Sequence, residues 1–256
     1  MPLLKISGLT HYFGGLKAVS DFELEVEPGE LVGIIGPNGA GKTTVFNLVT
    51  GVYRPTRGSI LFRDRDMVGL APSAIVSMGI ARTFQTIRLF RGLTVLDNVR
   101  IAQFSQVRYG LWRGLLRTRE FLAEEDRIRE KSLELLDVFN LRRYALAPAG
   151  GLPYGEQRRL EIARALACKP SLLLLDEPAA GMNPGEVLRL MELIQWLRKR
   201  FNLTILLIEH QMRVVMGICE RIKVLDFGET IAEGKPNEIQ DNPRVLEAYL
   251  GKEMVL

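Results

Sequence analysis

Residues Gly36 to Thr43 form the stretch that most constrains the chain. Their sequence, Gly-Pro-Asn-Gly-Ala-Gly-Lys-Thr, fits the pattern G-x-x-x-x-G-K-[ST] without a mismatch. In such a loop the glycines let successive backbone N–H groups face phosphate oxygens, the lysine reaches the outer phosphates and the last hydroxyl can ligate Mg²⁺. The apolar run Leu31–Ile35 before it predicts a buried strand, and Thr44–Val49 after it predicts a helix. We therefore expect a P-loop that binds a nucleoside triphosphate.

The composition indicates an ordinary globular protein. With 256 residues, 47% hydrophobic and 25% charged, the chain is long enough for a core and a subdomain. A net charge of +4 permits an anionic partner or a membrane surface without requiring one. No apolar run approaches the roughly 18 residues of a membrane span, and the N-terminus lacks a signal-peptide pattern. Cys168 and Cys219 are expected to be free thiols in a reducing cytosol.

Two further apolar runs end in polar residues that suit phosphate chemistry. Leu172–Leu175 is followed by Asp176 and Glu177, and Thr204–Ile208 is followed by a polar pair that ends in His210. Both runs predict buried strands, and ligands of open α/β sheets bind at the carboxyl ends of strands. Asp176 is suited to hold Mg²⁺, and Glu177 to orient or deprotonate a water. A lone histidine at a strand end is more often structural, so both interpretations of His210 stay open on the residues alone.

The middle of the chain changes character from about residue 87 to 151, where helical periodicity replaces strand patterns. Thr94–Asp97 resembles a capping box, and residues 121–140 predict an amphipathic helix. Its expected inner face consists of Ile128, Leu133, Leu135, Leu136 and Phe139. Within the same region, residues 104–119 mix apolar side chains with arginines. This segment fits a cationic amphipathic patch that contacts a membrane or a membrane protein, but a loop-helix excursion packed on its own subdomain is the favoured interpretation.

Two features outside these strands are candidate nucleotide contacts. Tyr12 and Phe13 would point to opposite faces of a strand, so only one of them could stack on a base, and a core aromatic is the favoured interpretation on the residues alone. Gly155 and Glu156 open a helix whose backbone N–H groups form a second candidate anion site. An ordinary helix that starts at a glycine is the alternative there.

The order and spacing of these motifs resemble the ATP-binding subunit of ABC transporters from end to end. Within that family, the chain is similar to the ATPases of branched-chain amino acid importers, in particular their LivG-like type. The stretches that carry this closer resemblance are Phe13–Val19, Arg82–Gln85, Arg88–Phe90, Tyr154–Arg164, Asp176–Pro184 and Ala248–Gly251.

The resemblance implies an α/β fold: a P-loop NTPase (RecA-like) core with an antiparallel β subdomain and an inserted α-helical subdomain. Residues 1–256 would form a single ABC ATPase domain, with the nucleotide-binding core in residues 1–86 and 158–235. The helical subdomain would span residues 87–157, and a C-terminal helical tail residues 236–256.

The resemblance also assigns roles to matching positions. Glu177 would act as general base, His210 would contact the γ-phosphate, and Gln85 would sense Mg²⁺ and the attacking water. Mg²⁺ would be held by Thr43, Asp176 and Gln85. The residues expected around ATP are Phe13, which stacks on adenine, and Gly36, Pro37, Asn38, Gly39, Ala40, Gly41, Lys42, Thr43, Thr44, Tyr154, Gly155 and Glu156.

Some positions depart from the family pattern. Pro153 stands where the signature Leu-Ser-Gly-Gly-Gln has serine, and Tyr154 replaces a glycine. Asn183 stands where an aspartate follows the catalytic glutamate, and Gln211 where this subgroup often has aspartate. Because Gly155 and the helix N-terminus remain, we expect this element still to complete the ATP site of a neighbouring subunit. Two unequal sites in a heterodimer would fit these changes.

The function implied by the resemblance is ATP hydrolysis that drives import, with branched-chain amino acids as the expected cargo. The expected partners are membrane permease subunits and a second ATPase subunit, as homodimer or heterodimer, with a periplasmic solute-binding protein only indirectly involved and no nucleic acid. The expected location is peripheral, on the cytoplasmic side of the inner membrane. The alternatives are a lipopolysaccharide-export ATPase, a soluble ABC protein outside transport, and a binding-only regulator.

Overall fold

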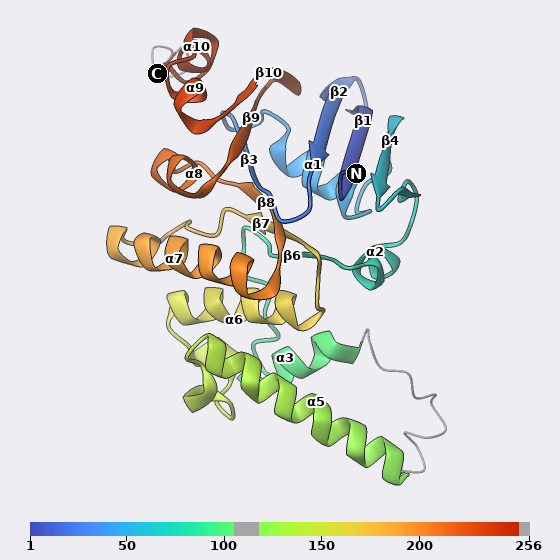
Figure 1. The fold of residues 1–256 in the computed structure, drawn as a ribbon, viewed down its shortest axis with the longest axis vertical. Helices are drawn as coiled ribbons and strands as arrows, with labels where there is room; N and C mark the ends of the chain where they lie inside the picture. The colour runs from blue at the N-terminus through green and yellow to red at the C-terminus, as the bar shows by residue number, and fades with distance from the viewer. Residues whose placement is uncertain (105–117, 251–256) are drawn as a thin grey trace. The chain divides into compact units, whose positions relative to one another are not determined.

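The computed structural model describes residues 1–104 and 118–250 (Figure 1). The chain divides into two compact units, of which one comprises Met1–Ile75 together with Ser171–Leu256 and the other is the continuous segment Val76–Pro170. The first unit therefore contains the P-loop and both strand ends that carry candidate catalytic residues. The second contains Gln85 and residues 152–157.

A mainly parallel sheet forms the centre of the first unit. β3 (Leu31–Ile35) lies between β9 (Arg221–Asp226) and β8 (Thr204–Ile208), and β7 (Leu172–Asp176) pairs with the far side of β8. These four strands are parallel, whereas β10 (Glu229–Gly234) is antiparallel to β9 at the edge. Every residue of β3, β7 and β8 is buried, as expected of strands covered on both faces. The buried strands predicted from these apolar runs are confirmed.

Helices connect the parallel strands of this sheet. α1 (Lys42–Val49) follows the P-loop, α7 (Pro184–Phe201) joins β7 to β8, and α8 (Met212–Ile218) joins β8 to β9. Asn183 caps α7 through a reciprocal capping box with Glu186, which is a structural use of this departure from the family pattern. The described part of the chain closes with α9 (Pro236–Gln240) and α10 (Pro243–Leu250). These helices lie in the predicted helical tail, of which residues 251–256 lie outside the described residues.

A second, four-stranded sheet of the same unit is antiparallel, in the order β2-β1-β4-β5. Its strands are β1 (Leu4–Phe13), β2 (Leu16–Val26), β4 (Arg57–Phe62) and β5 (Arg65–Asp66). In β2 the side chains of Phe22, Leu24 and Val26 are buried while the glutamates between them are exposed. The alternation of apolar and acidic residues over 22–26 in the sequence predicts a strand with one face toward solvent, and the structure confirms it.

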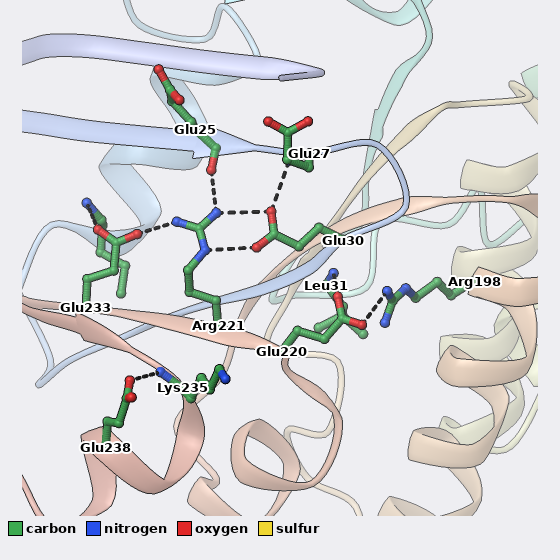
Figure 2. A network of polar contacts seen from close by, with 11 residues as sticks. Glu25, Glu27, Glu30, Leu31, Arg198, Glu220, Arg221, Glu233, Lys235 and Glu238 are labelled. Atoms are coloured by element: carbon green, nitrogen blue, oxygen red, sulfur yellow. Dashed lines mark hydrogen bonds and ion pairs between the residues drawn. The ribbon is translucent and has the colours of Figure 1, made fainter. Parts of the chain in front are cut away.

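A polar network around Arg221 of β9 connects the two sheets (Figure 2). Arg221 donates from Nε to Glu30 Oε1 at 2.8 Å and also bonds Glu233 of β10 and the carbonyl of Glu25 in β2. Lys223 lies 2.7 Å from the second oxygen of Glu233 and donates to the carbonyl of Glu23 in β2. The two basic side chains thereby bind carbonyl groups of β2 in one sheet and the Glu233 carboxylate of β10 in the other.

The second unit is mostly helical. It contains the short strand β6 (Ile80–Arg82) and the helices α3 (Val95–Gln103), α5 (Arg119–Val138) and α6 (Tyr154–Ala167), and α2 (Pro72–Met78) spans the boundary between the units. Thr94 caps α3 by accepting a hydrogen bond from Asp97 N at 3.0 Å, which confirms the predicted helix start. Helix α3 packs against both α5 and α6. The predicted helical character of this part of the chain is confirmed.

The inner face of α5 differs from the predicted one in part. Ile128, Leu136 and Phe139 are buried as expected, but Leu133 and Leu135 are only half-buried and Ser132 takes the intervening inner position. Ser132 Oγ accepts from Gln103 Nε2 of α3 at 2.7 Å, so a buried polar pair lies between these helices. Of residues 104–119, where a cationic membrane patch was one interpretation, 105–117 lie outside the described part of the chain. Among the described helices, none combines the length and apolar character needed to cross a bilayer.

Candidate functional site

The P-loop leaves β3 and enters α1 in the expected strand–loop–helix arrangement. Gly41 is the N-cap of α1 and has a φ of 99°. Lys42 is 5% exposed, and its Nζ donates to the carbonyl oxygens of Gly36 at 2.7 Å and Pro37 at 2.9 Å. The ammonium group is therefore held over the loop by the loop's own backbone. Thr43, the residue expected to ligate a metal, is exposed.

Two glycines of this loop are packed against neighbouring backbone. A Cβ atom on Gly36 would lie 2.0 Å from the carbonyl oxygen of Leu225 in β9, and one on Gly41 would lie 2.4 Å from that of Ala18 in β2. Both residues also have φ values in the left-handed region, 147° and 99°. The carbonyl of Ala40 accepts from Gly228 N at 3.0 Å, in the turn between β9 and β10. The loop is thus fixed on several sides by the first unit.

Three strand ends meet at one level of the parallel sheet. Ile34 in β3 and Asp176 in β7 are both in register with Ile208 in β8. Because the strands are parallel, the residues that follow them emerge at the same edge. The P-loop, Glu177 and His210 therefore share the edge that the sequence predicted.

Glu177 and His210 form a direct side-chain pair at this edge. Nε2 of His210 lies 2.5 Å from Oε1 of Glu177. Glu177 has a φ of 47°, a left-handed conformation that is uncommon outside glycine. It is 8% exposed, and Asp176 beside it is 1% exposed. Two carboxylates and an imidazole are thus gathered where a phosphate-binding loop begins.

Glu209 is a further residue of this edge to which the sequence assigned no role. It is 2% exposed, and its carboxylate accepts from the backbone N–H groups of Ala179 at 2.7 Å, His210 at 3.0 Å and Gln211 at 3.3 Å. Burial raises the pKa of Glu209, and these N–H donors act in the opposite direction. The side chain thereby ties the backbone after Glu177 to the backbone at His210. The sequence did hold a signal for Glu209, since both Glu209 and His210 follow the apolar run of β8. Only His210 was considered as a site residue.

An aromatic cluster surrounds Phe13 at the end of β1. The Phe13 ring meets His11 edge to face at 4.7 Å and Tyr53 at 5.2 Å, and His11 stacks on Tyr53 at 5.6 Å. Phe13 is 42% exposed and Tyr12 41%. The interpretation of a core aromatic is therefore wrong, because a short β1–β2 turn leaves both rings at the surface. His11 and Tyr53 support the ring, and no pattern in the sequence indicated this.

In the second unit, Gln85 and residues 152–157 have well-defined surroundings. The sequence of residues 81–85 predicts a strand that ends in the Gln85 amide. In the structure β6 ends at Arg82, so this predicted strand is too long and Gln85 lies in the segment beyond it. Helix α6 begins at Tyr154, one residue before the expected start at Gly155, with Pro153 as its N-cap. Proline has no N–H to donate, and no side chain caps the helix there. Tyr154 is 46% exposed, so this helix end is open to solvent.

Two family models match the chain. One, described as ABC transporter, matches residues 19–180, and the other, described as branched-chain amino acid ATP-binding cassette transporter, matches residues 229–255.

Proteins of known role are similar over almost the whole chain. The high-affinity branched-chain amino acid transport ATP-binding protein LivG of Escherichia coli (strain K12) is 50% identical over 98% of each chain. The lipopolysaccharide export system ATP-binding protein LptB of Acidithiobacillus ferridurans is 37% identical over 97% of each chain.

Solved structures show the same fold. The ADP conformation of MJ1267, an ATP-binding cassette of an ABC transporter, has a TM-score of 0.85 with 31% identity, over 98% of this chain and 99% of that one. The dimeric post-hydrolysis cassette MJ0796, bound to ADP and Pi, has a TM-score of 0.76 with 27% identity, over 91% and 98%.

Proposed function

The chain belongs to the ABC transporter family, as an ATP-hydrolysing, ATP-binding subunit of the branched-chain amino acid type, and we propose that it powers the import of these amino acids. In this function ATP binding brings two ATPase subunits together and hydrolysis separates them. The observation that carries the proposal is the edge at which the P-loop, Asp176, Glu177 and His210 emerge from parallel strands in register. This edge supplies phosphate binding and a candidate general base in one unit.

The P-loop would hold the triphosphate through its backbone N–H groups and Lys42. The Lys42 ammonium is buried and already directed at the loop by the carbonyls of Gly36 and Pro37. A desolvated cation attracts phosphate oxygens more strongly than an exposed one. The α1 N-terminus adds partial positive charge. Phe13, framed by His11 and Tyr53, is the proposed contact for adenine.

The residues present fit a divalent cation. Thr43 is exposed and offers a hydroxyl, and Asp176 offers a carboxylate at the end of β7, in register with the strand end beside the P-loop strand. Hard oxygen ligands of this kind suit Mg²⁺. Bound Mg²⁺ would neutralise charge on the phosphate oxygens. Gln85, in the other unit, is the third proposed ligand, a role that the family resemblance alone supports.

Glu177 would orient the attacking water and take its proton. Its carboxylate is nearly buried, and one of its oxygens faces the His210 imidazole. The His210 imidazole holds the carboxylate in place and, when protonated, can also stabilise charge on the γ-phosphate. Glu209 fixes the backbone that carries both residues. The reaction is thereby accelerated by positioning and electrostatics rather than by a covalent intermediate.

The proposed partners are a second ATPase subunit and membrane permeases. MJ0796 is a dimeric cassette of this fold, and the open N-terminus of α6 after Pro153 offers N–H groups to a nucleotide held by a neighbour. For the permease contact, the second unit has large apolar side chains that are exposed, among them Phe90, Leu93 and Leu146. Such a subunit would work on the cytoplasmic face of the membrane as a peripheral protein.

Amino acid import is favoured over lipopolysaccharide export. The identity is 50% with LivG and 37% with LptB over similar spans. A test is the uptake of labelled leucine by cells that lack this chain and carry either the wild type or Glu177→Gln. We expect uptake with the wild type only, while uptake of an unrelated sugar stays constant. Equal leucine uptake in both strains would contradict the proposal.

A further inference from the structure

Arg158 and Glu161 form a buried ion pair on the second unit's helix α6. The side chain of Arg158 is 0% exposed and that of Glu161 1%, and Nη1 of Arg158 lies 2.7 Å from Oε2 of Glu161. Burying two charges costs free energy unless further hydrogen bonds satisfy them, and an apolar pair in their place often stabilises a protein equally well. Stability alone therefore does not account for this ion pair, and its other hydrogen bonds indicate its role.

Both side chains bind the backbone of the segment that contains Gln85. Arg158 donates from Nη1 to the carbonyl of Phe84 at 2.7 Å and from Nη2 to that of Gln85 at 2.9 Å. Glu161 Oε1 accepts from the N–H groups of Phe84 and Arg88, each at 3.3 Å. Donors and acceptors of this short segment are thus matched by one cation and one anion from a single helix turn.

The segment lies between the end of β6 at Arg82 and the start of α3 at Val95, outside both elements. Farther along it, the buried Asn98 binds both the N–H and the carbonyl of Phe90, at 2.9 and 3.1 Å. Hydrogen bonds from buried side chains take the place of regular secondary structure here.

We propose that Arg158 and Glu161 are positioning residues for Gln85, and that they make Gln85 move together with α6. The N-terminus of α6 carries residues 152–157, which are proposed to face the neighbouring subunit's nucleotide. The pair therefore connects the part of the chain that serves the partner's site with the glutamine that serves its own. This inference rests on the proposed role of Gln85 in ATP hydrolysis.

Arg158→Lys in the full chain is the sharpest test. Lysine keeps the positive charge but lacks the planar guanidinium group that donates to two carbonyls at once. We expect kcat for ATP hydrolysis to fall about tenfold, the effect of losing roughly one charged hydrogen bond, with KM for ATP changed by less than about twofold. In a Gln85→Ala background the same substitution should cause no further decrease. Hydrogen exchange at the amides of residues 84–88 should become faster.

A matched control is Gln103→Leu, which removes a different buried polar pair of this unit without touching residues 84–88. It should leave kcat and the exchange of those amides unchanged. Wild-type kcat in Arg158→Lys, or additive losses with Gln85→Ala, would overturn the inference while leaving the proposed function intact. Wild-type kcat in Gln85→Ala would instead refute the role proposed for Gln85, and the positioning role with it.

Discussion

Nε2 of His210 lies 2.5 Å from Oε1 of Glu177, across 33 residues of sequence. The two side chains meet because β7 and β8 are neighbours and end in register. Two features fix the Glu177 and His210 side chains in this position. Glu177 has a left-handed backbone conformation, and the N–H of His210 donates to the carboxylate of Glu209. The imidazole thus fixes one oxygen of the carboxylate that is proposed to act on water.

Glu177→Gln should stop turnover while nucleotide binding persists. An amide keeps the size of the carboxylate but cannot accept the proton of water, and general bases contribute about 10²- to 10⁴-fold to rates. Phosphate release should therefore fall at least about 100-fold, and size-exclusion chromatography with ATP should show a trapped dimer. Hydrolysis at the parental rate would refute the general-base assignment.

Lys42→Ala should weaken ATP binding by about 10- to 100-fold, since a hydrogen bond to a charged group is worth about 1.5–3 kcal/mol. Lys5→Ala is the matched control, because Lys5 pairs with Glu25 on the surface, away from the loop. Titration calorimetry measures the Kd of both variants for ATP. Equal affinity of the two variants would contradict the assignment of Lys42 to the phosphate site.

Gly36→Ala should destabilise the chain far more than Gly39→Ala. Both glycines have positive φ values, 147° and 81°, but a Cβ at Gly39 meets nothing within 4 Å, whereas one at Gly36 collides with the Leu225 carbonyl. We expect a cost of about 1 kcal/mol at Gly39 from the backbone alone and about 3 kcal/mol or more at Gly36 from the added overlap. Thermal unfolding compares them, and similar Tm values would contradict this packing.

Stability should depend on pH through Glu233. Burial alone would raise the pKa of Glu233, but Lys223 and Arg221 lower it below its usual 4.5. A lowered pKa in the folded state gives stability that is present above pH 4.5 and is lost as the pH falls through the folded pKa. Glu233→Gln should cost on the order of 1 kcal/mol at pH 7, allowing for a side chain that is one-third exposed. In urea unfolding the difference should shrink at pH 3.5, and a constant difference would refute the coupling.

Cys219 should resist thiol reagents in the folded chain. Burial raises the pKa of its thiol to about 12, so only about 10⁻⁴ of it is thiolate at pH 8. In a Cys168→Ser variant, labelling with a disulfide reagent should be slow until urea unfolds the protein. Equally fast labelling before and after unfolding would show that Cys219 is accessible.

The sequence predicted best those parts of the fold that depend on local pattern. The apolar runs before Gly36, Asp176 and Glu209 are long and continuous, and parallel topology then brings their ends together. The P-loop pattern itself requires a strand and a helix around it. These features need no knowledge of distant contacts.

The features that the sequence did not predict depend on partners far along the chain. Arg158 binds carbonyls 73 and 74 residues away, and in the sequence it is one of three arginines on its helix. Glu209 looks like the solvated end of a strand until its three N–H donors are known. The strand expected over 81–85 was too long because apolar and aromatic residues there continue the pattern beyond the last ladder pairing.

The tight packing of Gly36 and Gly41 against the carbonyls of Leu225 and Ala18 bears on how such chains diverge. These two glycines are required by the neighbouring backbone, whatever ligand the loop holds. A descendant that no longer used ATP would still keep them, under selection for folding alone. Thr43 is exposed, and no neighbouring backbone requires it. Its presence is therefore a better indication than the glycines that a diverged chain still hydrolyses ATP.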